Sequence, residues 1–264
     1  MIWIAAYLAT GVVVGFLAGL LGIGGGMVMV PILAALFAAQ GFAPDHVLHL
    51  ALGTSMAAIL FTASASTREH HRLGSVDWTA MGRLAPGMAG GTLIASLASG
   101  IVPQNLLAGA FSVIVVVAAT QIGFGRKPAP GQRPPGTLLT GLVGLLIGIV
   151  CGLVSVGGAF MTVPFLLWCG VPARTAIGTG AALGLPTALL GTLGYGIAGW
   201  SVPGLPAGSV GFVQTVALAA VVVTSVWMAP LGARLAHRLP VPTLRKVFAL
   251  MLYAVAVKTL WAYV

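Results

Sequence analysis

The stretch GLLGIGGGMVMVP at residues 19–31 returns later in the chain as GLVSVGGAFMTVP at residues 152–164. Both copies begin with Gly-Leu, contain a Gly-Gly pair, end with Val-Pro and lie between long apolar arms. Consecutive glycines interrupt a helix because glycine loses more conformational freedom than any other residue when it is ordered. Inside a bilayer, an interrupted helix is tolerated only where its freed backbone groups line a cavity or are buried in protein. Two breaks in corresponding positions are typical of the binding site of a membrane transporter.

The composition of the chain is that of an integral membrane protein. Hydrophobic residues make up 59% of the 264 residues, charged residues only 6%, and the mean hydropathy is +1.08. Soluble domains contain about 25% charged residues. Four stretches lack Lys, Arg, Asp and Glu, and each exceeds the roughly 20 residues of one spanning helix. These stretches are residues 1–44, 84–125, 134–173 and 175–233.

Several classes of function are not expected of this chain. Its net charge of +9 does not indicate a nucleic-acid partner, because the basic residues lie in short loops between apolar runs, where the positive-inside rule explains them. Cys151 and Cys169 have no Cys-x-x-Cys or Cys/His spacing, so we expect neither a metal nor a cofactor. No His-Glu-x-x-His motif or other catalytic constellation occurs, so we do not expect an enzyme.

Internal similarity divides the chain into two repeats. Residues 51–54 (ALGT) match residues 176–179 (AIGT), and the Ala-Pro pair at 85–86 matches the pair at 229–230, in the same order as the glycine motifs. We predict an all-α polytopic membrane protein in which two repeats, residues 1–125 and 137–264, are joined by a basic, Pro-rich cytoplasmic linker at 126–136. Each repeat contains a broken helix pair and three full-length helices. The predicted ranges are 3–40, 47–67, 78–99 and 103–122, then 137–169, 174–197, 210–236 and 241–262.

The distribution of basic residues indicates whether each broken pair crosses the membrane or folds back. If both pairs cross, the twelve Lys and Arg residues divide seven to five between the two faces. If both pairs are re-entrant hairpins, all of them except Lys258 lie on one face, as the positive-inside rule expects of short loops. We therefore favour hairpins over crossing pairs, with the basic loops in the cytoplasm, both termini in the periplasm and the second repeat inverted relative to the first.

The candidate site lies at the two breaks. After each break the chain re-enters a helix, and we expect Pro31 or Pro164 in the first turn of that helix. The free amide groups of this turn and the positive end of the helix dipole form a receptor for a small anion. Hydroxyl groups of the following helices can add donors at similar depth. The predicted substrate-binding residues are Gly24, Gly25, Gly26, Thr54, Ser55, Gly157, Gly158 and Thr179.

The same residue types also have simpler structural roles. Small residues permit close helix packing in membranes, so the break glycines can serve packing alone. We expect only that role of Gly15, Gly19, Gly148 and Gly152. The hydroxyls of Thr54 and Thr179 can instead bond to carbonyls of their own helices. Glu69 lies within the basic segment 68–72, which favours a solvated loop cluster over a proton or gating switch.

The motif at residues 19–26, the Val-Pro pair at 30–31 and the Gly-Thr-Ser at 53–55, with the same order in the second half, resemble the TauE/SafE sulfite exporter family, also called the TSUP family. The resemblance covers essentially the whole chain. It implies an inner-membrane carrier of small sulfur-containing anions, such as sulfite, sulfoacetate or a related organosulfonate. Ser155 and Ala159 depart from the glycines of the first copy.

The expected activity is export by alternating access around a site at the membrane midplane. With the cytoplasm negative, moving one negative charge outward releases about 2.3 kcal/mol per 100 mV, so export needs no coupling ion. An importer or channel for thiosulfate, sulfate or another small anion is the alternative. The expected partners are a small anionic substrate and the lipid bilayer, while the oligomeric state does not follow from the sequence.

Overall fold

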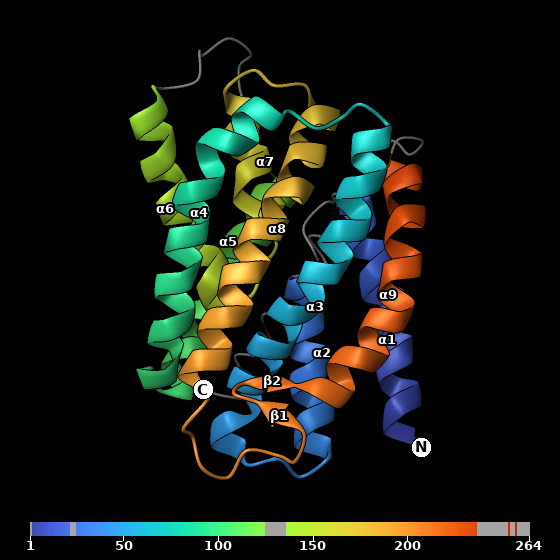
Figure 1. The fold of residues 1–264 in the computed structure, drawn as a ribbon, viewed down its shortest axis with the longest axis vertical. Coiled ribbons are helices and arrows are strands. Elements are labelled where there is room, and N and C mark those ends of the chain that lie inside the picture. Colours follow the sequence, from blue (N-terminus) through green and yellow to red (C-terminus); the bar gives the residue numbers. More distant parts are fainter. Residues whose placement is uncertain (1, 22–24, 125–135, 237–252, 254–256, 258–264) are drawn as a thin grey trace.

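The structure is a bundle of long helices (Figure 1). This computed structural model describes residues 2–21, 25–124 and 136–236, together with residues 253 and 257. The first half contains α1 (Ile2–Leu21), α2 (Gly26–Ala39), α3 (Pro44–Arg72), α4 (Trp78–Ala98), η1 (Ser99–Ile101) and α5 (Gln104–Phe124). The second half contains α6 (Thr137–Val154), α7 (Ala159–Trp168), α8 (Ala173–Ala198), β1 (Ser209–Val210), β2 (Val213–Gln214) and α9 (Thr215–Ala236). Within this part of the chain, six helices are long and apolar enough to span a membrane, which confirms the all-α polytopic class.

One predicted helix begins later than its sequence indicates. The range 210–236 is wrong in its first residues, because β1 and β2 form a short antiparallel hairpin and α9 begins at Thr215. Glycines in left-handed backbone conformations precede and form this turn, with φ of 80° at Gly208 and 55° at Gly211. The predicted helix 241–262 lies outside the ranges that the structure describes.

Both broken pairs fold back on themselves. Gln40, just after α2, donates a hydrogen bond from Nε2 to the hydroxyl of Tyr7 near the start of α1, and the Tyr7 and Phe37 ring centroids are 6.2 Å apart. The first pair therefore begins and ends at one end of the bundle, the lower end in Figure 1. The second pair, α6 and α7, begins and ends at the upper end. The two hairpins thus enter the bundle from opposite ends.

The prolines of the repeated motif lie deeper in their helices than expected. Pro31 is the sixth residue of α2 and Pro164 the sixth residue of α7, so the prediction of a first-turn proline is wrong. The physical reason is that the chain becomes helical directly at the glycines. Proline has no N–H group, so the carbonyl groups of Met27 and Phe160, four residues earlier, lose their usual intrahelical partners.

Stripes of glycine bring two pairs of parallel helices into backbone contact. In α1, Gly11, Gly15 and Gly19 face Val221, Ser225 and Ala229 of α9. In α6, Gly144, Gly148 and Gly152 face Leu84, Met88 and Thr92 of α4. Residues four apart share one helix face, and glycine there lets the backbones approach closely. The packing role predicted for Gly15, Gly19, Gly148 and Gly152 is therefore confirmed.

The two glycine stripes correspond residue by residue. Each glycine of α6 is numbered 133 above its counterpart in α1, and each contact residue of α9 is numbered 137 above its counterpart in α4. The match of 85–86 with 229–230, which differ by 144, is therefore wrong by seven residues. Seven residues are about two helical turns. A helix made almost entirely of apolar residues has few sequence features that fix the alignment of the two repeats to within two turns.

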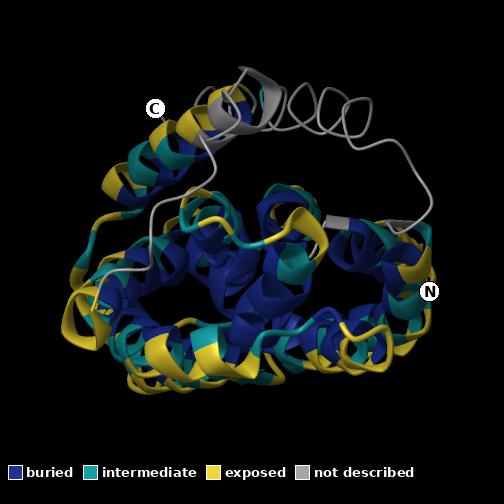
Figure 2. Cartoon of the chain, turned by 90° about the horizontal axis from the view of Figure 1, so that it is seen from above, coloured by how far each residue is buried: buried dark blue, intermediate teal, exposed yellow. Residues whose placement is uncertain are grey.

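The fourth helix of each half packs against the other half. α9 lies along α1 and α4 lies along α6, so the chain forms one group of α1, α2, α3 and α9 and another of α4, α6, α7 and α8 (Figure 1). The long helices α3 and α8 join the groups, with Met56 against Gly191 and Ala63 against Gly184. Buried residues fill the centre of the bundle and exposed ones lie at its periphery (Figure 2).

The glycine stripes lead to a stability prediction for α6. A Cβ at Gly148 would overlap the carbonyl oxygen of Met88, whereas a Cβ at Gly141 meets nothing within 4 Å. We expect Gly148→Ala to lower the free energy of unfolding by about 1–3 kcal/mol, since the helices have to separate. The control Gly141→Ala should be neutral or stabilising, because alanine favours a helix by about 0.5–1 kcal/mol over glycine. Thermal unfolding of the detergent-solubilised variants measures both effects, and equal unfolding temperatures would contradict the proposed contact.

Candidate functional site

The two chain breaks meet in the centre of the bundle. We call residues 25–28 elbow 1 and residues 155–159 elbow 2. A Cβ at Gly26 would overlap the carbonyl oxygen of Ser155, so the backbones of the two elbows are in direct contact. Gly25 has a φ of 75°, and Ser155 is the single described non-glycine residue with a positive φ, at 47°. Both elbows therefore need unusual backbone geometry to meet.

Each elbow places the N-terminus of a helix in the interior. In elbow 1, the amides of Val28 and Met29 donate to the Gly25 carbonyl at 3.1 and 3.0 Å, so those of Gly26 and Met27 precede the first bonds of α2. α7 begins in the same way after Gly158. Such first-turn amides and the positive end of the helix dipole attract anions. Because the hairpins come from opposite ends, the start of α2 meets elbow 2, the segment that leads into α7.

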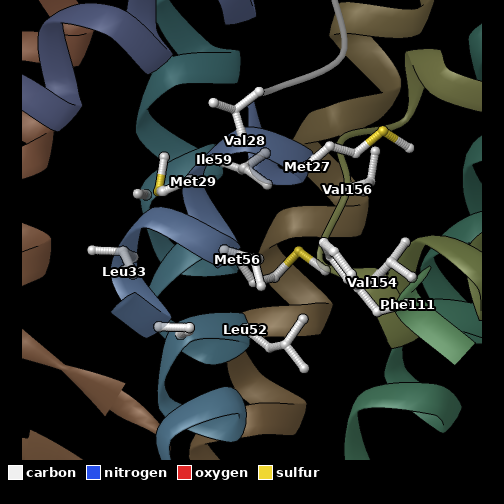
Figure 3. Close-up of a cluster of buried hydrophobic side chains, with 14 of the residues drawn as sticks. Met27, Val28, Met29, Leu33, Leu52, Met56, Ile59, Phe111, Val154 and Val156 are labelled. Atoms are coloured by element: carbon white, nitrogen blue, oxygen red, sulfur yellow. The ribbon is translucent and has the colours of Figure 1, made fainter. Parts of the chain in front are cut away.

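The environment of the elbows is apolar. Figure 3 shows side chains of both elbows, among them Met27 and Val156, in one cluster with Met56 of α3 and Phe111 of α5. These four side chains are fully buried. Methionine side chains adapt their shape readily, so this cluster can repack around small groups of varied form. A hydrogen bond or dipole is worth more in such surroundings than in water.

One predicted hydroxyl lies on the face of α3 that contacts elbow 1. Ser55 of α3 is fully buried, and its Oγ has no hydrogen-bond partner among the residues that the structure describes. Ile59, one turn later on the same face of α3, contacts Gly26, because a Cβ at Gly26 would lie 2.9 Å from the Ile59 Cδ1. A buried hydroxyl with no partner is rare and calls for an explanation. The Ser55 hydroxyl therefore has a hydrogen left to donate.

The predicted threonines bond away from the elbows. The backbone N–H of Gln214, just before α9, donates to the Thr54 Oγ1 at 2.9 Å, and that of Asp77, just before α4, donates to the Thr179 Oγ1 at 2.9 Å. The preceding glycines, Gly53 and Gly178, lie against the carbonyls of Phe212 and Ser75. Each Gly-Thr pair therefore holds the start of the exchanged helix, and each hydroxyl keeps one hydrogen to donate.

The remaining predicted residues divide between the elbows and the undescribed part of the chain. Gly25 and Gly26 lie in elbow 1, and Gly157 and Gly158 lie in elbow 2. A Cβ at Gly158 would crowd Leu183 of α8, so this glycine also serves close packing. Gly24 lies outside the described ranges.

Two polar residues of the site are not among the predicted ones. The Ser155 Oγ donates to the Leu52 carbonyl at 2.7 Å, and the buried Tyr195 hydroxyl donates to the Gly152 carbonyl at 2.8 Å. Both satisfy backbone carbonyls next to an elbow. In the sequence, Tyr195 is noticeable only as a lone tyrosine in a helix of small residues. Ser155 is noticeable only because it replaces a glycine of the first copy of the motif.

The expectation for Glu69 is wrong. Glu69 is only 8% exposed and lies in the last turn of α3, not in a solvated loop. The Arg234 Nε lies 2.9 Å from one carboxylate oxygen and the Arg72 Nη1 lies 3.7 Å from the other. Arg234 is 165 residues away in the sequence, so a pattern of neighbouring residues cannot identify this pair.

The described arginines gather at one end of the bundle, which we call the basic end. They lie near the ends of α3 and α9 and near the starts of α4 and α8, and these helix ends meet at the top of Figure 1. The residues are Arg68, Arg72, Arg83, Arg174 and Arg234. This segregation is the one expected for re-entrant hairpins.

Comparison with known proteins decides the family. The family model described as sulfite exporter TauE/SafE matches residues 7–259. The chain belongs to the TauE/SafE family. A relative from Haemophilus influenzae, named a probable membrane transporter protein, is 36% identical over 251 residues, which cover 95% of each chain. A probable membrane transporter protein from Xylella fastidiosa is 30% identical over 96% of this chain and 94% of its own. The Bacillus subtilis probable membrane transporter protein YdhB is 26% identical over 86% of this chain and 87% of its own.

The reciprocal threonine bonds of this TauE/SafE protein give a second stability prediction. We expect Thr54→Val and Thr179→Val each to lower the free energy of unfolding by about 1–3 kcal/mol, because each leaves a backbone N–H without its acceptor, buried at Gln214 and half-buried at Asp77. Thr54→Ser should retain stability. Thr10→Val is the matched control, since the Thr10 hydroxyl bonds only to the Ala6 carbonyl of its own helix. Thermal unfolding in detergent gives the comparison, and a loss no larger than that of Thr10→Val would refute the bracing role.

Proposed function

We propose that this TauE/SafE membrane transporter exports small sulfur-containing oxyanions, such as sulfite, sulfoacetate or a related organosulfonate, across the inner membrane. The observation that carries the proposal is the contact of Gly26, the first residue of α2, with the Ser155 carbonyl of elbow 2, the segment that leads into α7, inside an apolar cluster. Free amides and helix dipoles there can bind an anion without a lysine or arginine, so the anion is held weakly enough to leave again.

The site is closed in this conformation. Gly26 lies against the Ser155 carbonyl, so no oxyanion fits between these two residues until the elbows separate. The Ser55 hydroxyl, which has no partner among the described residues, is then available to donate to the anion. Binding and elbow separation are thus coupled, as alternating access requires.

The proposed movement follows from the packing of the helices. We infer two inverted repeats with re-entrant hairpins, supported by the constant numbering differences between the two glycine stripes and by the reciprocal threonine bonds. Because α4 and α9 are exchanged, the rocking bodies are α1–α3 with α9 and α6–α8 with α4. The crossing of α3 and α8 and the contact of the elbows form the interface between these bodies.

A transport assay tests the site. We expect Gly26→Ala to reduce sulfite efflux from potential-clamped proteoliposomes at least about tenfold, because a methyl group blocks the elbow contact and crowds the free amides. Ser55→Ala should raise the KM for sulfite about 2- to 12-fold, the equivalent of a hydrogen bond of about 0.5–1.5 kcal/mol. Gly82→Ala is the control, since a Cβ at Gly82 meets nothing within 4 Å.

The outcomes of this assay test the position of the binding site and the mechanism of transport separately. Normal sulfite efflux by a correctly folded Gly26→Ala variant would exclude the elbows as the binding site. Unitary currents in place of a saturable flux would show that the protein is a channel and not a carrier.

Cysteine labelling tests the topology. In a variant with Cys151 and Cys169 replaced by alanine, we expect Ala43→Cys to react with a membrane-impermeant thiol reagent from the periplasm and Val171→Cys to react only from the cytoplasm. Ala43 precedes α3 and Val171 precedes α8, at opposite ends of the bundle. Labelling of both positions from the same side would exclude oppositely directed re-entrant hairpins.

A further inference from the structure

A groove between α3 and α9 lies on the outer surface of the bundle, at its basic end. Figure 1 shows the upper parts of these two helices next to each other. The groove has a volume of about 490 Å³. We call Phe61 of α3 with Val226 and Pro230 of α9 its apolar floor, and the charged residues beside them its basic rim. The basic rim consists of Arg68, Arg72 and Arg234 with Glu69, so it carries a net positive charge.

The groove faces outward. Its α3 residues Phe61, Ser64, Arg68 and Arg72 are all exposed, and their spacing of three or four residues places them on one side of the helix. Phe61 is 45% exposed, although it is a large apolar side chain. The outer side of a membrane-spanning helix meets lipid. Within the described part of the chain, the groove is therefore open to the bilayer and not to the interior of the bundle.

The floor and the basic rim lie at different depths in the membrane. Arg72 is the last residue of α3, and Phe61 lies eleven residues before it. Eleven residues of helix rise about 16 Å, which is about half of the roughly 30 Å hydrocarbon core of a bilayer. Arginines near a helix end extend their charged groups to the membrane surface. With the rim at that surface, the floor lies at the depth of the acyl chains.

Glu69 positions the arginines of the rim and leaves donors for a phosphate. One oxygen of its carboxylate accepts a hydrogen bond from the Arg234 Nε at 2.9 Å, and the other lies 3.7 Å from the Arg72 Nη1. The first bond uses only the Nε of Arg234, so its two Nη groups can still donate to a phosphate in bidentate fashion. The side chains of Arg72 and Arg234 are 68% and 55% exposed, so a ligand can reach them from the surface.

The equivalent helices at the opposite end of the bundle pack closely. Because Thr54 corresponds to Thr179 and Gln214 to Asp77, the counterparts of Glu69 and Arg234 are Gly194 of α8 and Leu97 of α4. A Cβ at Gly194 would overlap the Ser96 hydroxyl and lie 3.2 Å from the Leu97 nitrogen. The space between this pair of helices is therefore found at the end that carries the arginines.

We propose that the groove between α3 and α9 binds an anionic phospholipid of the leaflet at the basic end. The phosphate lies among the three arginines of the basic rim, and one acyl chain runs along the apolar floor. The net positive rim favours phosphatidylglycerol over phosphatidylcholine, because the ammonium group of choline offsets the charge of the phosphate. The groove is separate from the elbows, so this binding does not depend on which anion is transported.

Lipid binding to the purified protein in a neutral detergent tests the proposal. Native mass spectrometry measures the affinities for phosphatidylglycerol and phosphatidylcholine in separate titrations. We expect Arg68→Gln combined with Arg72→Gln to weaken the affinity for phosphatidylglycerol at least about tenfold, because each arginine at a membrane surface contributes roughly a factor of five. The affinity for phosphatidylcholine should change little, which also shows that the variant is folded.

The matched control removes two arginines from the same end of the bundle. Arg83 and Arg174 are exposed and lie outside the groove. Arg83→Gln combined with Arg174→Gln should therefore retain the affinity for phosphatidylglycerol. An equal loss in both double variants would show a general attraction of lipid to the basic end and would overturn the proposed site.

Fluorescence quenching locates the lipid. In the variant without native cysteines, a bimane fluorophore is attached to Ser64→Cys, which lines the groove, or to Leu146→Cys, an exposed position of α6 at similar depth. The proteins are reconstituted in phosphatidylcholine vesicles that contain a small fraction of either brominated phosphatidylglycerol or brominated phosphatidylcholine. Brominated phosphatidylglycerol should quench the fluorophore at Ser64→Cys more strongly, whereas both lipids should quench equally at Leu146→Cys. Equal quenching by the two lipids at both positions would overturn the proposal.

A free anion offers the same phosphate chemistry, and a competition experiment distinguishes the two sources. Inorganic phosphate is added to the vesicles with Ser64→Cys and brominated phosphatidylglycerol, and sodium chloride of the same ionic strength is the control. We expect phosphate to reverse the quenching no more than chloride does, because the acyl chain on the apolar floor holds the lipid in place. Reversal by phosphate alone would show that the groove takes small free oxyanions and would overturn the lipid site.

Discussion

Backbone groups without helical partners inside an apolar environment are the constraint on which this fold depends. α2 and α7 begin in the interior at glycines, and Pro31 and Pro164 free further carbonyl groups a short distance along each helix. In the structure the two elbows contact each other, and the hydroxyls of Ser155 and Tyr195 donate to the carbonyls of Leu52 and Gly152 beside them. The proposed function requires an anion to replace this contact between the elbows when it binds.

The exchange of α4 and α9 decides which parts can move together. Glycine stripes join each exchanged helix to the hairpin of the other half, and the hydroxyls of Thr54 and Thr179 hold the first residues of those helices. The contacts within each group of helices continue over many turns, whereas the two groups contact each other mainly through α3, α8 and the elbows. A surface groove of about 490 Å³ separates α3 from α9 at the basic end, whereas Gly194 of α8 packs tightly against Ser96 of α4, so equivalent helices hold different spacings at the two ends.

Local patterns predict much of the helix content but not the long-range partners. The apolar runs and the charged loops locate most helices, and the repeated glycines locate both elbows. The hairpin at residues 209–214 is missed because its apolar residues continue the pattern of α9, and only the backbone conformations of Gly208 and Gly211 divide the two. Ser55 is placed at the elbow by its position in the repeat, while Thr54 bonds to a residue 160 positions away that no local pattern identifies.

The sequence by itself determined the membrane class, the two breaks and the grouping of the arginines, because hydropathy, glycine and loop charge act locally along the chain. Only the tertiary structure decided that the fourth helices are exchanged, that Glu69 pairs with Arg234 and that Gly26 lies against Ser155. These contacts join residues far apart in the sequence through backbone shape and close packing. Small apolar residues are compatible with many such partners, and the folded bundle selects one arrangement of them.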